Sequence, residues 1–303
     1  MTEQISRGEE WLAVVRQLAQ LLTADSRDAQ AADRDSPLPA LPRCGSVVLC
    51  SPHPDDESLT GALALRLARE SGAGVVNLAM TLGRDPARQA GRMLELAEAC
   101  RLLGFGNLRL DPPLASGSDN LGASDPVWQT LVAGLVARLT ELAPRLVFFP
   151  HGNDAHPTHL LVHRLVREAA LLYVRQTAGN LLLVETEYWH PMRYPNLLVG
   201  LSSEDVATLV GAVARHGGEV ARTPYHRLLP VRLADNVRRG GELLNGFGAG
   251  PPAFVFGDLY RLSLALPGRV LPLQRGIVWS PREAISVDAL LALFGETGKA
   301  MVR

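Results

Sequence analysis

Short apolar runs alternate with longer segments of helical periodicity along most of the chain, and this alternation is the strongest constraint on its fold. The apolar runs predict five strands, at residues 46–50, 74–80, 107–110, 145–149 and 181–188. Apolar residues at helical spacing predict helices at 58–70, 86–103 and 127–143, another that begins at Pro157, and one at 203–215. Because helices separate strands that are apolar throughout, we expect an α/β fold: a Rossmann-like parallel sheet with helices on both faces.

The N-terminal part of the chain is expected to lie outside this sheet. Apolar residues at helical spacing predict an N-terminal helix over residues 8–23. The polar and then Pro-rich stretch 24–42 predicts a linker. We therefore expect a helix and linker in residues 1–42 and a single domain over 43–303.

Within that domain we expect a regular core at residues 46–190 and an irregular C-terminal extension at 191–303. Residues 217–258 are rich in Gly, Pro and Arg, which predicts long loops with short elements. Loops on a rigid scaffold commonly carry binding specificity. We therefore expect residues 181–259 to close over the functional site and to select its ligand.

Charge and composition exclude several function classes. The 303 residues hold 30 Lys+Arg and 31 Asp+Glu, so no basic excess exists to attract nucleic acid or an anionic membrane. No uninterrupted apolar stretch is long enough for a membrane helix, and the amphipathic N-terminus has no signal-peptide core. Three cysteines without paired spacing favour a reducing compartment. We expect a cytoplasmic protein with a small-molecule partner; a homo-oligomer remains open.

A cluster of ionisable residues follows the first predicted strand, in the segment His53-Pro54-Asp55-Asp56-Glu57. Carboxylates packed this closely repel one another and favour protonation unless a cation offsets them. A divalent metal is the economical solution, since imidazole with carboxylate suits zinc. His53 and Asp56 can reach one metal from a single turn. Asp55 and Asp56 should point apart, which leaves one of them free to take a proton.

A second cluster follows the fourth predicted strand and holds His151, Asp154, His156, His159 and His163. Pro157 suits the first position of a helix, which places the last three histidines near one helical stripe. Ligands in parallel α/β sheets bind beyond the carboxyl ends of the strands, where both clusters are expected. A histidine from this stripe would complete three protein ligands with an open position, the arrangement of catalytic zinc.

Together the two clusters resemble the LmbE/PIG-L family of metal-dependent N-deacetylases. The resemblance rests on Ser-Pro-His-Pro-Asp-Asp-Glu after a strand and on Asp154-Ala-His-Pro-x-His159 about a hundred residues later. It extends to Arg92-x-x-Glu95-x-x-x-Ala99 on the helix after the second strand. The family implies hydrolysis of the amide of an N-acetylated amino-sugar conjugate, such as an N-acetylglucosamine derivative, with release of acetate and a free amine.

The resemblance also implies residue roles. His53, Asp56 and His159 would hold Zn²⁺, or another divalent metal such as Fe²⁺, and Asp55 would be the general base. His156, as an imidazolium, would stabilise the oxyanion. Arg92 would contact substrate, and so, more loosely, would Asp111 after the third strand.

Other features are less closely tied to the family. Many members have Asp where this chain has Thr158. In them this Asp orients the neighbouring histidine, and another carboxylate such as Asp154 would have to take that role here. Glu187 and Tyr188 end a predicted strand in a polar and aromatic run, which suits either a sugar pocket or ordinary packing. A segment around Arg222 suits either an anionic group of the substrate or plain surface.

Three other functions compete with the deacetylase. The same machinery would serve a metal hydrolase of another acyl or ester substrate. A catalytically silent ligand-binding protein on the same fold is possible in principle, although such a protein has no need of a free carboxylate beside a full ligand set. A nucleotide-binding Rossmann protein is excluded, because the first strand is followed neither by G-x-G-x-x-G nor by a P-loop.

Overall fold

The five predicted strands form the parallel half of one sheet in a computed structural model, which describes residues 16–17, 20, 46–114 and 121–295. Their order in space is β3-β2-β1-β4-β5, and each neighbouring pair is parallel. The strands are β1 (Val47–Ser51), β2 (Val75–Ala79), β3 (Gly106–Arg109), β4 (Leu146–Pro150) and β5 (Leu181–Thr186). The predicted α/β class is confirmed.

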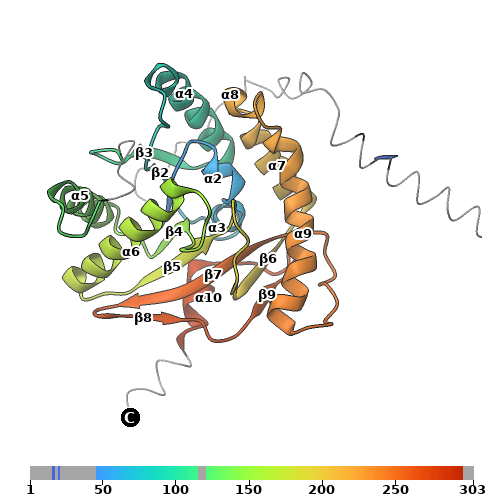
Figure 1. The fold of residues 1–303 in the computed structure, drawn as a ribbon. Coiled ribbons are helices and arrows are strands. Elements are labelled where there is room, and N and C mark those ends of the chain that lie inside the picture. The colour runs from blue at the N-terminus through green and yellow to red at the C-terminus, as the bar shows by residue number, and fades with distance from the viewer. Residues whose placement is uncertain (1–15, 18–19, 21–45, 115–120, 296–303) are drawn as a thin grey trace, which may run out of the picture.

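Alternate residues of each strand feed two separate cores. On β1, Val47 and Leu49 point into one hydrophobic cluster, whereas Val48 and Cys50 point into the other. Four helices connect the parallel strands: α3 (Ala62–Ser71), α4 (Pro86–Leu103), α5 (Pro126–Leu142) and α6 (Pro157–Thr177). The first two pack on one face of the sheet and the other two on the opposite face (Figure 1).

The predicted helix at 58–70 is two helices, α2 (Asp56–Leu59) and α3, which are separated at Thr60 and Gly61. A Cβ atom at Gly61 would lie 2.0 Å from the carbonyl oxygen of Glu57, so only glycine allows this break. The short α2 places the polar segment after β1 against the end of the sheet.

The C-terminal extension continues the same sheet, and its predicted irregularity was wrong for most of its length. It adds strands β6 (Leu197–Leu201), β7 (Phe256–Leu266), β8 (Arg269–Pro272) and β9 (Ile277–Trp279). Strand β7 lies between β5 and β6 and is antiparallel to both, so the complete sheet is mixed. Helices α7 (Ser203–Val213) and α10 (Val287–Ala292) pack on the same face as α3 and α4.

The expected loops at 217–258 are instead mostly the short α8 (Gly217–Val220) and the 21-residue α9 (Tyr225–Asn245). Pro230, Gly240 and Gly241 inside α9 weaken its helical signal in the sequence. The two glycines lie in its buried stripe: a Cβ atom at Gly240 would lie 2.8 Å from Leu198 Cδ2 on β6. Close packing on the sheet therefore stabilises α9 although the helix propensity of its residues is low.

The N-terminal prediction lies almost wholly outside the described residues. Of the predicted helix at 8–23, only Arg16, Gln17 and Gln20 are described, and they are helical and exposed. The linker at 24–42 lies outside as well, so the division at residue 43 stays a prediction. Among the helices of the described part, none is long and apolar enough to cross a bilayer.

Candidate active site

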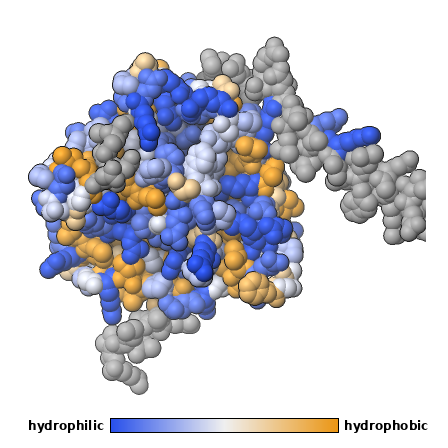
Figure 2. Space-filling view, viewed as in Figure 1, coloured by the Kyte–Doolittle hydropathy of each residue, from blue (hydrophilic) through white to orange (hydrophobic). Residues whose placement is uncertain are grey.

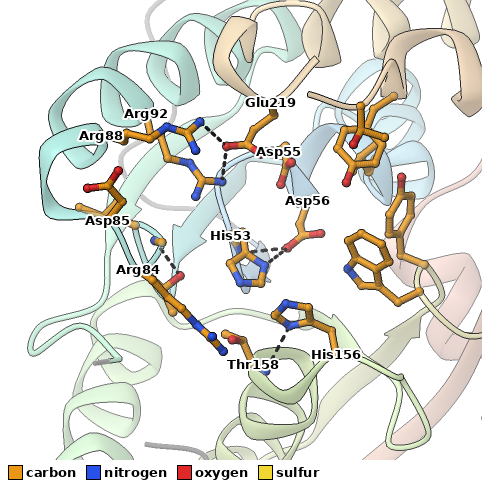
Figure 3. A pocket seen from close by; sticks show the side chains of 18 of the residues that line it. His53, Asp55, Asp56, Arg84, Asp85, Arg88, Arg92, His156, Thr158 and Glu219 are labelled. Atoms are coloured by element: carbon orange, nitrogen blue, oxygen red, sulfur yellow. Dashed lines mark hydrogen bonds and ion pairs between the residues drawn. The ribbon is translucent and has the colours of Figure 1, made fainter. Parts of the chain in front are cut away.

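The two ionisable clusters meet at the carboxyl edge of the sheet, because β1 and β4 are adjacent parallel strands. The first cluster follows β1 and runs into α2; the second follows β4 and runs into α6. The ring centroids of His53 and His156 lie 4.8 Å apart, and that of His159 lies within 5.4 Å of both. Residues a hundred positions apart in sequence thus share one small volume (Figure 3).

Asp56 lies between two of these imidazoles. Its Oδ2 atom is 3.4 Å from His53 Nδ1 and 3.4 Å from His159 Nε2, and it accepts a hydrogen bond from the His53 amide at 2.9 Å. Burial acts to raise the pKa of the Asp56 carboxyl, but the imidazoles of His159 and His53 outweigh it and hold that pKa well below its usual range. The carboxylate is therefore ionised and aimed at both histidines.

His159 has the environment of a metal ligand. Its side chain is buried, its Nδ1 atom faces Asp154 Oδ2 at 3.3 Å, and its Nε2 atom has no hydrogen-bond partner among the described residues. A carboxylate on one ring nitrogen fixes the proton there and leaves the lone pair of the other nitrogen for a metal. Burial lowers the pKa of His159, yet Asp56 and Asp154 raise it overall to about 10, so the site stabilises positive charge at Nε2.

His156 differs from His159 in its hydrogen bonding. It is the N-cap of α6, and its Nδ1 atom accepts a hydrogen bond from the Thr158 amide at 3.2 Å. The neutral tautomer therefore carries its proton on Nε2 and can donate it. Burial, followed by the neighbouring His53 and His159, lowers the pKa of His156 to about 4. This disagrees with the expected imidazolium, because no carboxylate pairs with the ring; Asp154 accepts only the His156 amide and faces His159 instead.

A metal ion therefore has two possible ligand sets here. His53, His156 and His159 bring one ring nitrogen each to within 4.8 Å of one another. His53, Asp56 and His159 form the set expected from the sequence. The Nδ1 hydrogen bond of His156 and the unpartnered Nε2 of His159 favour the second set, in which His156 remains a donor.

Asp55 has an unusual backbone conformation beside this set. Its φ angle is 123°, a region that non-glycine residues rarely adopt, and its amide donates to Glu57 Oε2 at 2.9 Å. Burial and, after it, the charges of Asp56 and Glu57 raise the pKa of Asp55 well above that of a free carboxyl. The positive charges of Arg92 and His159 lower this pKa, but their effect is smaller. Its side chain lines the open pocket, so this carboxylate is basic and reaches solvent-filled space.

His53, Asp55, Asp56 and His156 line a cleft of about 500 Å³. One wall is aromatic: Tyr188 and Trp189 follow β5, Tyr225 comes from the C-terminal extension, and the three rings contact one another with centroids 5.3–6.4 Å apart. The Trp189 ring also stacks on His156 at 6.0 Å. The opposite wall comes from the loop after β2 and the start of α4, with Arg84, Arg88 and Arg92 (Figure 3). The extension thus does lie beside the site.

Of the four residues that were expected to contact the substrate, two line the cleft and two do not. Arg92 and Tyr188 line the cleft. Glu187 does not: its carboxylate is buried, accepts a hydrogen bond from the Met192 amide and pairs with Arg239 on α9. Asp111 is exposed at the end of β3 and is not among the residues that line the cleft. The structure gives neither of these two a contact with a ligand in this cleft.

Several residues of the cleft were not singled out from the sequence, among them Arg84, Arg88 and Glu219. They sit on the loop after β2, on α4 and around α8, with no motif to mark them. The segment around Arg222, left open above, lines the cleft as well. The one feature of the sequence that could have indicated these residues is the polar composition of the loop after β2, which lies at the carboxyl edge of the sheet.

The part of the chain that carries this site is similar in sequence to known deacetylases. Residues 48–170 match the PIG-L family model, described as GlcNAc-PI de-N-acetylase. A 1D-myo-inositol 2-acetamido-2-deoxy-alpha-D-glucopyranoside deacetylase of Streptomyces griseus is 32% identical over 164 residues, which is 44% of this chain and 51% of that protein. The chain thus spans about half the length of the curated relatives it matches.

Two solved structures share the fold at low identity. The N,N'-diacetylchitobiose deacetylase of Pyrococcus horikoshii has a TM-score of 0.55 at 18% identity, covering 82% of this chain and 91% of that one. GalB of Pseudomonas putida KT2440, a 4-carboxy-2-hydroxymuconate hydratase, has a TM-score of 0.53 at 17% identity, covering 71% and 94%. Since these two neighbours catalyse different reactions, the fold alone does not determine the chemistry.

Proposed function

We propose that this protein, whose residues 48–170 match the model of the PIG-L family of de-N-acetylases, hydrolyses the amide of an N-acetylated amino sugar with the help of a divalent metal, most simply zinc. The observation that carries the proposal is the juxtaposition of a basic, cleft-facing carboxylate, Asp55, with His53, Asp56 and His159. An amide hydrolase needs such a carboxylate, whereas a ligand-binding protein does not.

The donor set fits the metal. His53, Asp56 and His159 offer two imidazole nitrogens and one carboxylate oxygen, the mixture that catalytic zinc sites use. The Nε2 atom of His159 faces the Asp56 carboxylate at 3.4 Å but makes no hydrogen bond among the described residues, which is otherwise costly for a buried group. When bound, the metal supplies a Lewis acid that polarises the amide carbonyl and makes a water molecule more acidic.

The remaining steps fall to the chain's own side chains. Asp55 takes a proton from the attacking water, which its raised pKa favours. His156 donates its Nε2 hydrogen to the carbonyl oxygen as negative charge develops there. Asp55 then returns its proton to the departing amine. Neutral His156 performs this role without an ion-pair partner, which explains how Thr158 is tolerated where relatives have Asp.

The aromatic wall favours a sugar. Tyr188, Trp189 and Tyr225 offer flat apolar surface next to the catalytic residues, and sugar rings present C–H faces of the same kind. Trp189 stacks on His156, so a ring held on this wall lies beside the donor that acts on the acyl oxygen.

The test combines metal content with product detection. Purified protein is analysed for bound metal and then assayed for amine release on N-acetylglucosamine, its glycosides and N-acylated amino acids. We expect about one divalent ion per chain and release from the sugars alone. Activity confined to esters or to other acyl donors would support the alternative metal hydrolase. Ligand binding without turnover, in metal-loaded protein, would support the silent binding protein.

A further inference from the structure

The half of the cleft that lies away from His53 and Asp56 carries an excess of positive charge. Apart from the aspartates of the metal site, the cleft is lined by four guanidinium groups, from Arg84, Arg88, Arg92 and Arg222, and by only two carboxylates, from Asp85 and Glu219. The Asp85 side chain is engaged as the N-cap of α4, where it accepts a hydrogen bond from the Ala87 amide. In Figure 2 the surface at the α4 end of the molecule is correspondingly hydrophilic.

Three of these arginines share one buried carboxylate. Arg88 Nη2 lies 2.8 Å and Arg92 Nη2 3.5 Å from Glu219 Oε1, and Arg222 contacts Glu219 Oε2. One carboxylate cannot neutralise three guanidinium groups, so donors remain available. The Arg222 side chain is 62% exposed, and the Arg88 side chain is 35% exposed. The fourth, Arg84, has no ion pair with any other described residue (Figure 3).

Two of the guanidinium groups occupy space that is open only because glycines lie beside them. A Cβ atom at Gly83 would lie 2.2 Å from Arg92 Nη1, and one at Gly218 would lie 2.9 Å from Arg88 Nη2. Arg92 also donates to the carbonyl oxygen of Pro54, within the segment that bears Asp55. Because Arg88 and Arg92 also pair with Glu219, these two groups are positioned by the protein itself, which reduces the entropy lost on binding.

We propose that this basic rim, formed by Arg84, Arg88 and Arg222, binds an anionic oxygen group, phosphate or carboxylate, on the part of the substrate that extends beyond the N-acylated sugar. The inference rests on the proposed deacetylase function and narrows its substrate class. Arginine forks suit both oxyanions, since each presents two oxygens to paired N–H donors. Arg92 links the rim to the Pro54 carbonyl, so the anion lies beside the reacting amide.

The experiment compares neutral and anionic versions of one sugar. Amine release is measured for methyl N-acetyl-α-glucosaminide, N-acetylglucosamine 1-phosphate and the carboxymethyl glycoside of N-acetylglucosamine, with metal-loaded enzyme. We expect kcat/KM for at least one anionic substrate to exceed that of the methyl glycoside by about tenfold, the value of one charge-assisted hydrogen bond. The two anionic arms show whether phosphate or carboxylate is preferred. Equal kcat/KM for all three substrates would overturn the proposal.

Variants locate the effect. The double variant Arg84→Gln/Arg222→Gln should bring the anionic-to-neutral ratio close to one, with the change mostly in KM. Arg138→Gln on α5 removes a positive charge outside the cleft and should keep the wild-type ratio. An unchanged ratio in the double variant would show that the rim does not bind the anion.

Direct binding of N-acetylglucosamine 1-phosphate by calorimetry separates this proposal from the proposed function. Arginine-dependent binding without amine release from any sugar would support the anion site and contradict the deacetylase. Binding that persists in the double variant and is lost with a chelator would place the phosphate on the metal, and would overturn the rim.

Discussion

His216 Nε2 donates a hydrogen bond of 2.8 Å to Glu57 Oε1, and both side chains are fully buried. The other oxygen of the same carboxylate, Oε2, accepts the amide of Asp55, the residue with the φ angle of 123°. A histidine between α7 and α8 thus supports the backbone of the proposed general base. The C-terminal extension contributes to the catalytic geometry as well as to the cleft wall.

Replacing His216 should affect catalysis more than substrate binding. His216→Leu removes one of the two donors to Glu57 Oε1 and leaves Ser58 Oγ as the other, which costs about 1–3 kcal/mol of stability and loosens the Asp55 backbone. We expect kcat to fall about tenfold or more with little change in KM. His216→Gln can still donate and should recover most of kcat. His226→Leu removes another buried histidine of the same extension and should lower stability without the kcat loss; a similar kcat loss there would show that the effect is general.

Replacing Asp55 should lower kcat, whereas replacing its neighbour Asp56 should lower metal affinity. Asp55→Asn leaves His53, Asp56 and His159 intact, so metal content should stay near wild type while kcat falls by about 10²–10⁴-fold. Asp56→Asn removes the carboxylate that both histidines face and should lower metal affinity itself. Metal analysis and amine release on both variants give the answer. Metal loss in Asp55→Asn with full occupancy in Asp56→Asn would reverse the two roles.

The two histidines of α6 provide an independent comparison. His159→Ala should lose metal, because its Nε2 atom faces the proposed site without a partner. His156→Ala should keep metal and lose kcat by about 10²–10³-fold, the usual effect of removing one oxyanion donor. Titration of each metal-free variant with zinc measures the affinities. Strongly reduced zinc affinity in His156→Ala would favour the three-histidine ligand set.

The place of the candidate site in the fold was predictable from the sequence because two physical rules converge on it. Buried strands that alternate with helices imply a parallel sheet, and polar clusters after two such strands must meet at its carboxyl edge. That reasoning brought His53 and Asp56 together with a histidine of α6, and the resemblance to the family then singled out His159. It could not distinguish the roles of His156 and His159, which depend on where each Nδ1 atom finds its partner, Thr158 N or Asp154 Oδ2.

The extension was less predictable because its order comes from tertiary contacts. In α9, Gly240 is buried against Leu198, a contact invisible to helix propensity. His216 lies 159 residues from Glu57, and neither flanking sequence indicates the pair. The same holds for Glu219 and the arginines of α4, which meet across the cleft.

Stability should depend on pH through His163, whose Nδ1 atom lies 2.9 Å from the Pro150 carbonyl oxygen. Burial lowers the pKa of this histidine from 6.5 to about 4. The unfolded chain therefore binds the proton more readily, so the stabilising contribution is full above pH 6.5 and declines as the pH falls toward 4. By pH 5 the loss is about 2 kcal/mol. Thermal unfolding of wild type and His163→Gln from pH 7 to pH 4.5 should show a smaller decline in the variant; parallel declines would contradict the assignment.

The packing of α9 on the sheet predicts opposite effects for the same substitution in two helices. Gly240→Ala would place a Cβ atom 2.8 Å from Leu198 Cδ2 and 3.3 Å from Leu259 Cδ2, in a fully buried contact. Overpacking of this kind costs about 1–3 kcal/mol, more than the helix propensity gained. Gly91→Ala on α4 is the matched control: Gly91 is exposed, and its Cβ atom would meet nothing within 4 Å.

We therefore expect Gly240→Ala to lower Tm by several degrees and Gly91→Ala to raise it slightly, by the propensity difference of about 0.5–1 kcal/mol. Differential scanning calorimetry of the two variants measures both shifts. If Gly240→Ala also raises Tm, α9 does not lie against β6 as closely as described. Tyr225, the first residue of α9, would then be held in the wall of the cleft by contacts other than the packing of α9 on β6.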